Sequence, residues 1–121
     1  MINERYYEGF EGDEEILLRL YAHDKEIEQL GVWSGYFNSI VKTIKPQKDG
    51  WTGLAYYYHL AIGWYDEENW EVPDLRLFYE QLMKVDEKLL VYNEDREVLH
   101  LLRCLFEKAI EKQGRITISS Y

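Results

Sequence analysis

DEEILLRLYAHDKEIEQL, residues 13–30, is the stretch on which the secondary-structure class of the first third of the chain depends. Its apolar residues recur roughly at helical spacing, at Ile16, Leu17, Leu20, Ile27 and Leu30. Asp13 is a suitable N-cap, the glutamates after it suit the positive end of a helix, and Gly31 is a suitable stop. The pattern predicts a helix over residues 13–30, with a break where His23 and Asp24 interrupt the apolar stripe.

Four further segments are predicted to be helical, because each has apolar residues at helical spacing and a residue suited to begin a helix. The last of them has the widest apolar stripe, which includes Leu102, and we expect it to lie centrally with the other helices around it. The predicted helices run from Ser34 to Pro46, from Thr52 to about Gly63, from Pro73 or Asp74 to Val85, and from Asn93 to Gly114.

The length and composition indicate one folded unit. A chain of 121 residues can bury one hydrophobic core, and 46% hydrophobic with 31% charged residues is a globular composition. In the tail RITISSY, residues 115–121, Ile116 and Ile118 alternate with polar residues as in a strand, for which only the N-terminal RYYEGF looks a suitable partner. We therefore expect a mainly α, single-domain bundle of about five helices over residues 1–121, to which the tail can add a short C-terminal strand.

The charge balance indicates the class of partner. Lys and Arg number 14 and Asp and Glu number 23, which gives a net charge of −9. Such a surface disfavours direct binding to nucleic acid or to an anionic membrane and favours a basic protein. The sequence contains neither a targeting segment nor an apolar run of membrane-spanning length, so we expect a cytoplasmic protein. Cys104, the single cysteine, excludes an internal disulfide and is expected to be buried among its apolar neighbours.

No motif for catalysis or metal binding is present in the sequence. The three histidines, at positions 23, 59 and 100, are far apart, so we expect no metal and no cofactor. A glycosidase would need two carboxylates at a fixed separation, whereas Asp66, Glu67, Glu68 and Glu71 crowd into one predicted loop. We therefore expect that the protein is not an enzyme.

Aromatic residues and carboxylates are concentrated in GWTGLAYYYHLAIGWYDEENW, residues 50–70, and five acids without a base lie within residues 66–74. Three consecutive helical tyrosines, at 56–58, sweep about 200° around the axis, so at least one should be exposed. Aromatic rings supply contact area, and carboxylates steer a basic partner, although the tryptophans suit the core as well as an interface. The candidate partner-binding residues are Tyr57, Trp64, Tyr65, Asp66, Glu67, Glu68, Trp70, Glu71 and Asp74.

Residues 50–82, GWTGLAYYYHLAIGWYDEENWEVPDLRLFYEQL, resemble the central region of small bacterial immunity proteins that accompany contact-dependent growth inhibition and related polymorphic toxins. The shared features are the Gly-Trp-x-Gly-Leu-Ala start, the aromatic helix, the acidic Trp-Tyr loop and the helix after Pro73. The resemblance implies a cytoplasmic antidote that binds a cognate basic toxin domain, commonly a nuclease such as an RNase or tRNase, and occludes its active or substrate-binding site. The charge pattern leaves an alternative, an acidic nucleic-acid mimic or regulatory adaptor that occupies a host nucleic-acid-binding protein.

Overall fold

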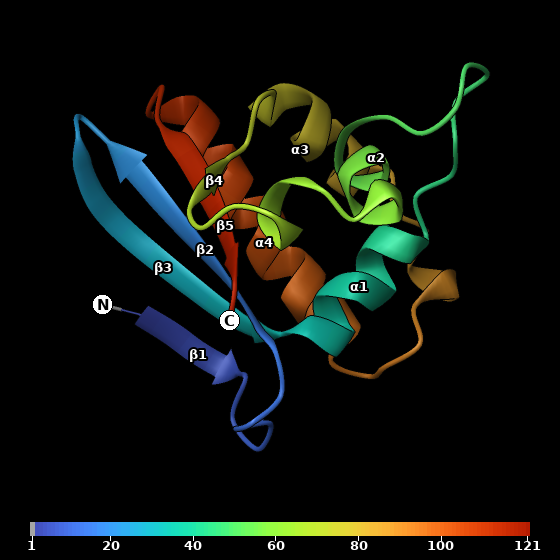
Figure 1. Ribbon diagram of the computed structural model, residues 1–121, viewed down its shortest axis with the longest axis horizontal. Coiled ribbons are helices and arrows are strands. Elements are labelled where there is room, and N and C mark those ends of the chain that lie inside the picture. Colours follow the sequence, from blue (N-terminus) through green and yellow to red (C-terminus); the bar gives the residue numbers. More distant parts are fainter. Residues whose placement is uncertain (1) are drawn as a thin grey trace.

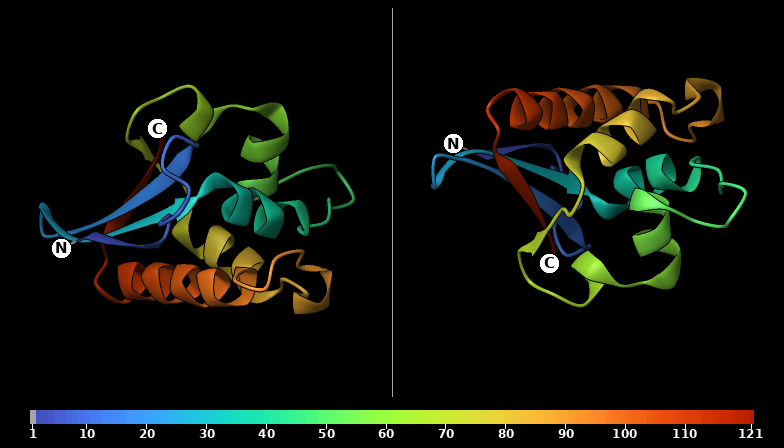
Figure 2. Two further views of the ribbon diagram at one scale, coloured as in Figure 1. Left: turned by 90° about the horizontal axis from the view of Figure 1, so that it is seen from below. Right: turned by 90° about the horizontal axis from the view of Figure 1, so that it is seen from above.

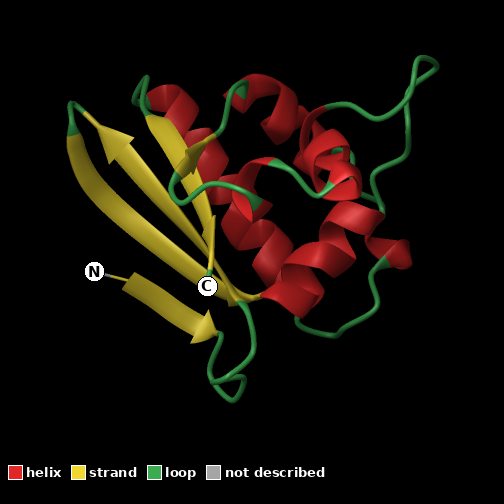
Figure 3. Cartoon of the chain, in the orientation of Figure 1, coloured by secondary structure: helices red, strands yellow, loops and turns green. Residues whose placement is uncertain are grey.

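The computed structural model describes residues 2–121, which form an α/β fold with strands gathered on one side and helices on the other (Figure 1, Figure 3). The expectation of a mainly helical bundle is wrong, because residues 13–30 form strands and not a helix. In chain order the elements are β1 (Ile2–Tyr6), β2 (Glu15–Ala22), β3 (Lys25–Trp33), α1 (Ser34–Lys42), α2 (Gly53–Leu60), the 3-10 turn η1 (Gly63–Tyr65), β4 (Trp70–Glu71), α3 (Leu75–Met83), the 3-10 turn η2 (Glu87–Leu89), α4 (Asp95–Glu111) and β5 (Arg115–Ser120).

The segment predicted as the first helix is a β-hairpin. Strands β2 and β3 pair antiparallel, from Glu15 opposite Trp33 to Ala22 opposite Lys25. The two residues between the strands, His23 and Asp24, have φ angles of 54° and 62°. Positive φ at both positions is the geometry of a type I′ turn, which matches the twist of the strands it joins. The residues that interrupt the apolar stripe are therefore the turn of the hairpin.

The sheet has five strands in the order β1-β3-β2-β5-β4, with β1 parallel to β3 and the other neighbours antiparallel. The predicted C-terminal strand is present as β5, but its predicted pairing with the N-terminal segment is wrong. Strand β5 instead pairs with β2, where Ile118 lies opposite Leu18. Because β3 and β2 lie between β1 and β5, the two ends of the chain cannot be neighbours in the sheet.

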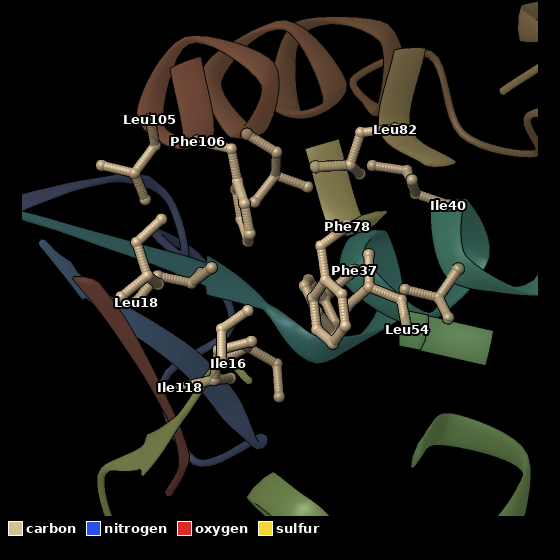
Figure 4. Packing of buried hydrophobic residues seen from close by; sticks show 14 of the residues in the cluster. Ile16, Leu18, Phe37, Ile40, Leu54, Phe78, Leu82, Leu105, Phe106 and Ile118 are labelled. Atoms are coloured by element: carbon tan, nitrogen blue, oxygen red, sulfur yellow. The ribbon is translucent and has the colours of Figure 1, made fainter. Parts of the chain in front are cut away.

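One face of the sheet packs on the helices and forms the core. Leu18 of β2 and Ile118 of β5 point toward Phe106 of α4, and Phe37 and Phe78 extend this apolar layer toward α1 and α3 (Figure 4). The prediction that the last helix supplies core residues is confirmed, since seven residues of α4 are buried. None of the helices within residues 2–121 is both long and apolar enough to cross a bilayer.

Cys104 lies on the exposed side of α4, so the expectation that it is buried is wrong. Its Sγ atom is 3.6 Å from Nε2 of His100, one helical turn earlier. The residues of α4 that face the sheet include Leu102 and Leu105, and the helical period turns position 104 away from them.

Candidate functional site

The candidate residues lie on one connection, which runs from α2 through η1 to β4. Gln81 of α3 holds the start of α2, because its Oε1 accepts the N–H of Leu54 at 2.9 Å and its Nε2 donates to the carbonyl of Thr52 at 2.8 Å. Thr52 is the N-cap residue, as predicted, but its side chain makes no capping hydrogen bond. The helix ends at Leu60, and the φ of 53° at the following Ala61 turns the chain out of the helical direction.

Asp66, Glu67 and Glu68, here termed the acidic loop, follow directly after η1 and are exposed. The carbonyl of Gly63 accepts the N–H groups of Asp66 at 3.0 Å and Glu67 at 2.9 Å. Gly63 has a φ of 76°, and a Cβ at this position would lie 3.1 Å from the ring of Trp70. A glycine is therefore required where the chain turns outward into the acidic loop.

The other end of the acidic loop is attached to the sheet. The N–H of Asn69 donates to Oγ of Ser119 on β5 at 2.9 Å, and the Arg19 guanidinium on β2 donates to the side-chain oxygen of Asn69. Arg19 and Ser119 alternate with core-facing residues, so they lie on the sheet face away from α4. Figure 2 shows the connection passing on that side of the sheet. Attachment at both ends reduces the entropy that the loop would lose on binding.

The carboxylates of the acidic loop differ from the neighbouring ones, Glu71 and Asp74, because they have no partner within the protein. Glu71 pairs with Arg115 at 3.3 Å, and Asp74 caps α3 by accepting the N–H of Leu77 at 3.0 Å, as predicted for a helix that begins there. Within residues 2–121, none of the three acidic-loop carboxylates is paired with a lysine or arginine side chain. Their exposure leaves them free to meet basic groups of a partner.

A row of four rings leads to the acidic loop. The ring centroids of Trp51 and His59 are 3.8 Å apart, those of His59 and Tyr58 are 5.1 Å apart, and those of Tyr58 and Tyr65 are 6.4 Å apart. We term these residues the aromatic row. Its two ends are accessible, with Trp51 36% and Tyr65 38% exposed. Exposed aromatic faces beside carboxylates are suited to lysine and arginine side chains, which pair with the charge and stack on the ring.

Tyr65 joins the aromatic row to the acidic loop. The pKa of Tyr65 is raised to about 12. Partial burial of the side chain is the largest cause, and the nearby Tyr58 and Glu14 add to it. The phenol therefore stays protonated at neutral pH and can donate a hydrogen bond. Glu14, which precedes β2, is the most distant in sequence of the residues that raise this pKa.

The structure separates the predicted binding residues into two groups. Trp64 and Trp70 are 2% and 9% exposed, so they lie in the core beneath the surface, where a partner cannot touch them. Tyr57 is half-buried against Trp70, with ring centroids 4.6 Å apart. The prediction that at least one of the three consecutive tyrosines is exposed is confirmed by Tyr56, which is 40% exposed.

The residues predicted to bind a partner do not include Trp51, Tyr56, His59 and Leu60, which the structure shows to be exposed. Tyr56 and Leu60 lie one turn apart on α2, and Leu60 is 52% exposed. The sequence feature that could have identified these residues is that α2 carries apolar or aromatic residues on every side. A helix of this kind is either fully enclosed or leaves an apolar face for a partner.

Neither a metal site nor a similarity to known proteins indicates a function for this surface. No group of three or more His, Cys, Asp or Glu side chains in the described part of the chain is arranged to hold a metal ion. Comparisons with protein-family models, curated proteins and solved structures give no match. The acidic loop and the aromatic row are the features that indicate a function.

Proposed function

We propose that this protein is an antidote, an immunity protein that binds a basic toxin domain and occludes its active or substrate-binding site. The observation that carries the proposal is the position of three unpaired carboxylates beside the aromatic row, on a loop attached at both ends. Interfaces combine well-packed aromatic anchors with charged groups around them. The surface has both components, and it acts by binding without catalysis.

The charge of the whole chain supports the same partner class. A toxin that cleaves RNA or another nucleic acid needs a basic cleft for phosphates. A net charge of −9 attracts such a domain over a distance and speeds its association, while the acidic loop pairs with the cleft at contact. An antidote of this kind acts in the cytoplasm, where the toxin would meet its substrate.

The shape of the charged surface favours a dedicated antidote over a nucleic-acid mimic. A mimic needs carboxylates spaced along an extended face as phosphates are spaced along a strand. Here the three carboxylates of the acidic loop are consecutive residues, and the neighbouring Glu71 and Asp74 have internal partners. A compact acidic and aromatic patch is suited to one pocket or cleft of a partner.

The experiment that tests the proposal compares three tagged forms of the chain expressed in the source cells. They are the wild type, the triple variant D66K/E67K/E68K, and the triple variant E80K/E107K/E111K. The control changes exposed carboxylates of α3 and α4 and gives the same change in net charge. We expect one basic domain to co-purify in stoichiometric amount with the wild type and the control and to be lost with D66K/E67K/E68K. Equal recovery with all three forms would reject the acidic loop as the binding surface.

A further inference from the structure

A groove lies between the end of α1 and the segment that joins α3 to α4. Both elements lie on the side of the molecule remote from the sheet (Figure 1). The groove consists of a cavity of about 560 Å³ and a second cavity of about 250 Å³. Thr43, Lys45 and Leu89 line both cavities, which therefore lie side by side. We term it the basic groove, because Lys42 lines its first part and Lys84 its second, with Lys45 between them.

The apolar wall of the basic groove is held rigidly. Asp95 is fully buried, and its Oδ2 accepts the hydroxyl of Ser39 at 2.6 Å and the N–H groups of Val91 at 3.2 Å and Tyr92 at 3.0 Å. The backbone that carries Val91 is therefore fixed, yet its side chain is 76% exposed and that of Leu89 is 49% exposed. Apolar side chains presented on a fixed backbone and left outside the core are typical of a binding surface.

The polar groups of the groove indicate the chemistry of its ligand. Within residues 2–121, Lys42, Lys45 and Lys84 have no carboxylate within ion-pair distance, although the chain has an excess of acids. Asp86 also lines the groove, and its Oδ1 accepts the N–H of Lys88 at 3.0 Å. Unpaired lysines favour an anionic ligand.

Asn38 adds a second requirement. Its Oδ1 atom is buried and has no hydrogen-bond donor, and the residue lines the first cavity. A buried acceptor without a donor is unfavourable. When the Asn38 side chain turns into the first cavity, its amide oxygen can accept an N–H group of a ligand, which removes the deficit. A peptide backbone supplies such a group, whereas a simple carboxylate ion does not.

We propose that the basic groove binds an extended acidic segment of a partner protein. Carboxylates of the segment pair with the three lysines, and an apolar side chain packs on Leu89 and Val91. A backbone N–H of the segment donates to Asn38. The groove is built from other residues than the acidic loop and selects the opposite charge, so this inference is independent of the antidote function.

The test uses the full ¹⁵N-labelled chain and a blocked six-residue peptide of alternating Glu and Leu, followed by amide chemical shifts. We expect saturable shifts confined to residues 35–45 and 84–92. The K42Q/K45Q variant should bind about five- to tenfold more weakly, as the loss of two exposed ion pairs implies. The matched control K25Q/K112Q, which loses the same charge outside the groove, should bind as the wild type does.

A second variant and a second peptide test the remaining parts of the inference. Val91→Ser should weaken binding about threefold without changing stability, because the side chain is 76% exposed. A peptide with Gln in place of Glu should shift the groove signals far less. Equal shifts with the Gln peptide, or groove signals that stay unchanged with the Glu peptide, would overturn the inference. Groove signals that shift with protein concentration alone, and do so in the wild type but not in K42Q/K45Q, would show that a second copy of the chain occupies the groove. That result would also overturn the inference.

Discussion

The carboxylate of Glu15 on β2 occupies the space above Gly31 on β3 that a side chain at position 31 would fill. Glu4 of β1 reaches the same place from the other side, with its Cγ 3.1 Å from that position. Burial of Glu15, then a hydrogen bond with Glu4 and the charge of Glu4, raise the pKa of Glu15 from 4.5 to about 7. Two carboxyl groups therefore share one site across three strands.

This pair predicts that stability depends on pH near neutrality. Because folding raises the pKa of Glu15, its contribution is fully present below about pH 4.5 and is lost as the pH rises through about 7. The free energy of unfolding in urea should be lower at pH 8 than at pH 5, and the difference should shrink in Glu15→Gln. A variant that loses stability as steeply as the wild type over this range would show that another group is responsible.

The same contact predicts the effect of a side chain at position 31. The Cβ of Gly31→Ala would meet the tip of the flexible Glu15 side chain, which can move into solvent. The pKa of Glu15 should then fall toward its ordinary value, with the fold retained. An NMR titration of the Glu15 carboxyl group measures this change, and a pKa that stays near 7 in the variant would contradict the geometry.

Asp95 is predicted to be the most costly polar residue to remove. Asp95→Ala leaves the hydroxyl of Ser39 and two backbone N–H groups without their acceptor, so the free energy of unfolding should fall by about 3 kcal/mol. Ser39→Ala removes a single hydrogen bond and should cost about 1 kcal/mol. Chemical denaturation measures both, and an equal or smaller loss for Asp95→Ala would contradict its role as an anchor.

The tryptophans should divide into a structural and a binding group. Trp64→Ala should destabilise the fold by about 3–5 kcal/mol, because the side chain is 2% exposed and packs against Phe37. Trp51→Ala should cost less than about 1 kcal/mol and should instead weaken partner binding, because Trp51 ends the aromatic row. Thermal unfolding and binding measurements on the two variants check this division. A large loss of stability in Trp51→Ala would place that ring in the core.

Helices α1, α3 and α4 were predictable because each buries one stripe of a regular helical pattern. The hairpin was not, because β2 is buried on both faces and therefore shows a nearly continuous apolar run, Ile16 to Leu18, in place of a clean alternation. Its turn, His23 and Asp24, lacks the glycine that usually marks a type I′ turn. The apolar residues of two different strands therefore looked, in the sequence, like one helical stripe.

The site was predictable where charge alone decides exposure. Asp66, Glu67 and Glu68 have no place in a core, and they are exposed. Aromatic residues suit both environments, so the sequence could not tell that Trp64 and Trp70 are buried while Trp51 and Tyr65 reach the surface. That distinction depends on the course of the connection over the sheet, which tertiary contacts such as those of Asn69 determine.

The most direct test of the antidote function is a titration of the captured basic domain's toxic activity with purified protein. The wild type and the control E80K/E107K/E111K should abolish that activity at one equivalent, because the acidic loop occupies the toxin's active or substrate-binding site. The variant D66K/E67K/E68K, with an unchanged thermal unfolding temperature, should fail to inhibit. A domain that stays fully active when saturated with the wild type, or one that D66K/E67K/E68K inhibits equally well, would contradict the account.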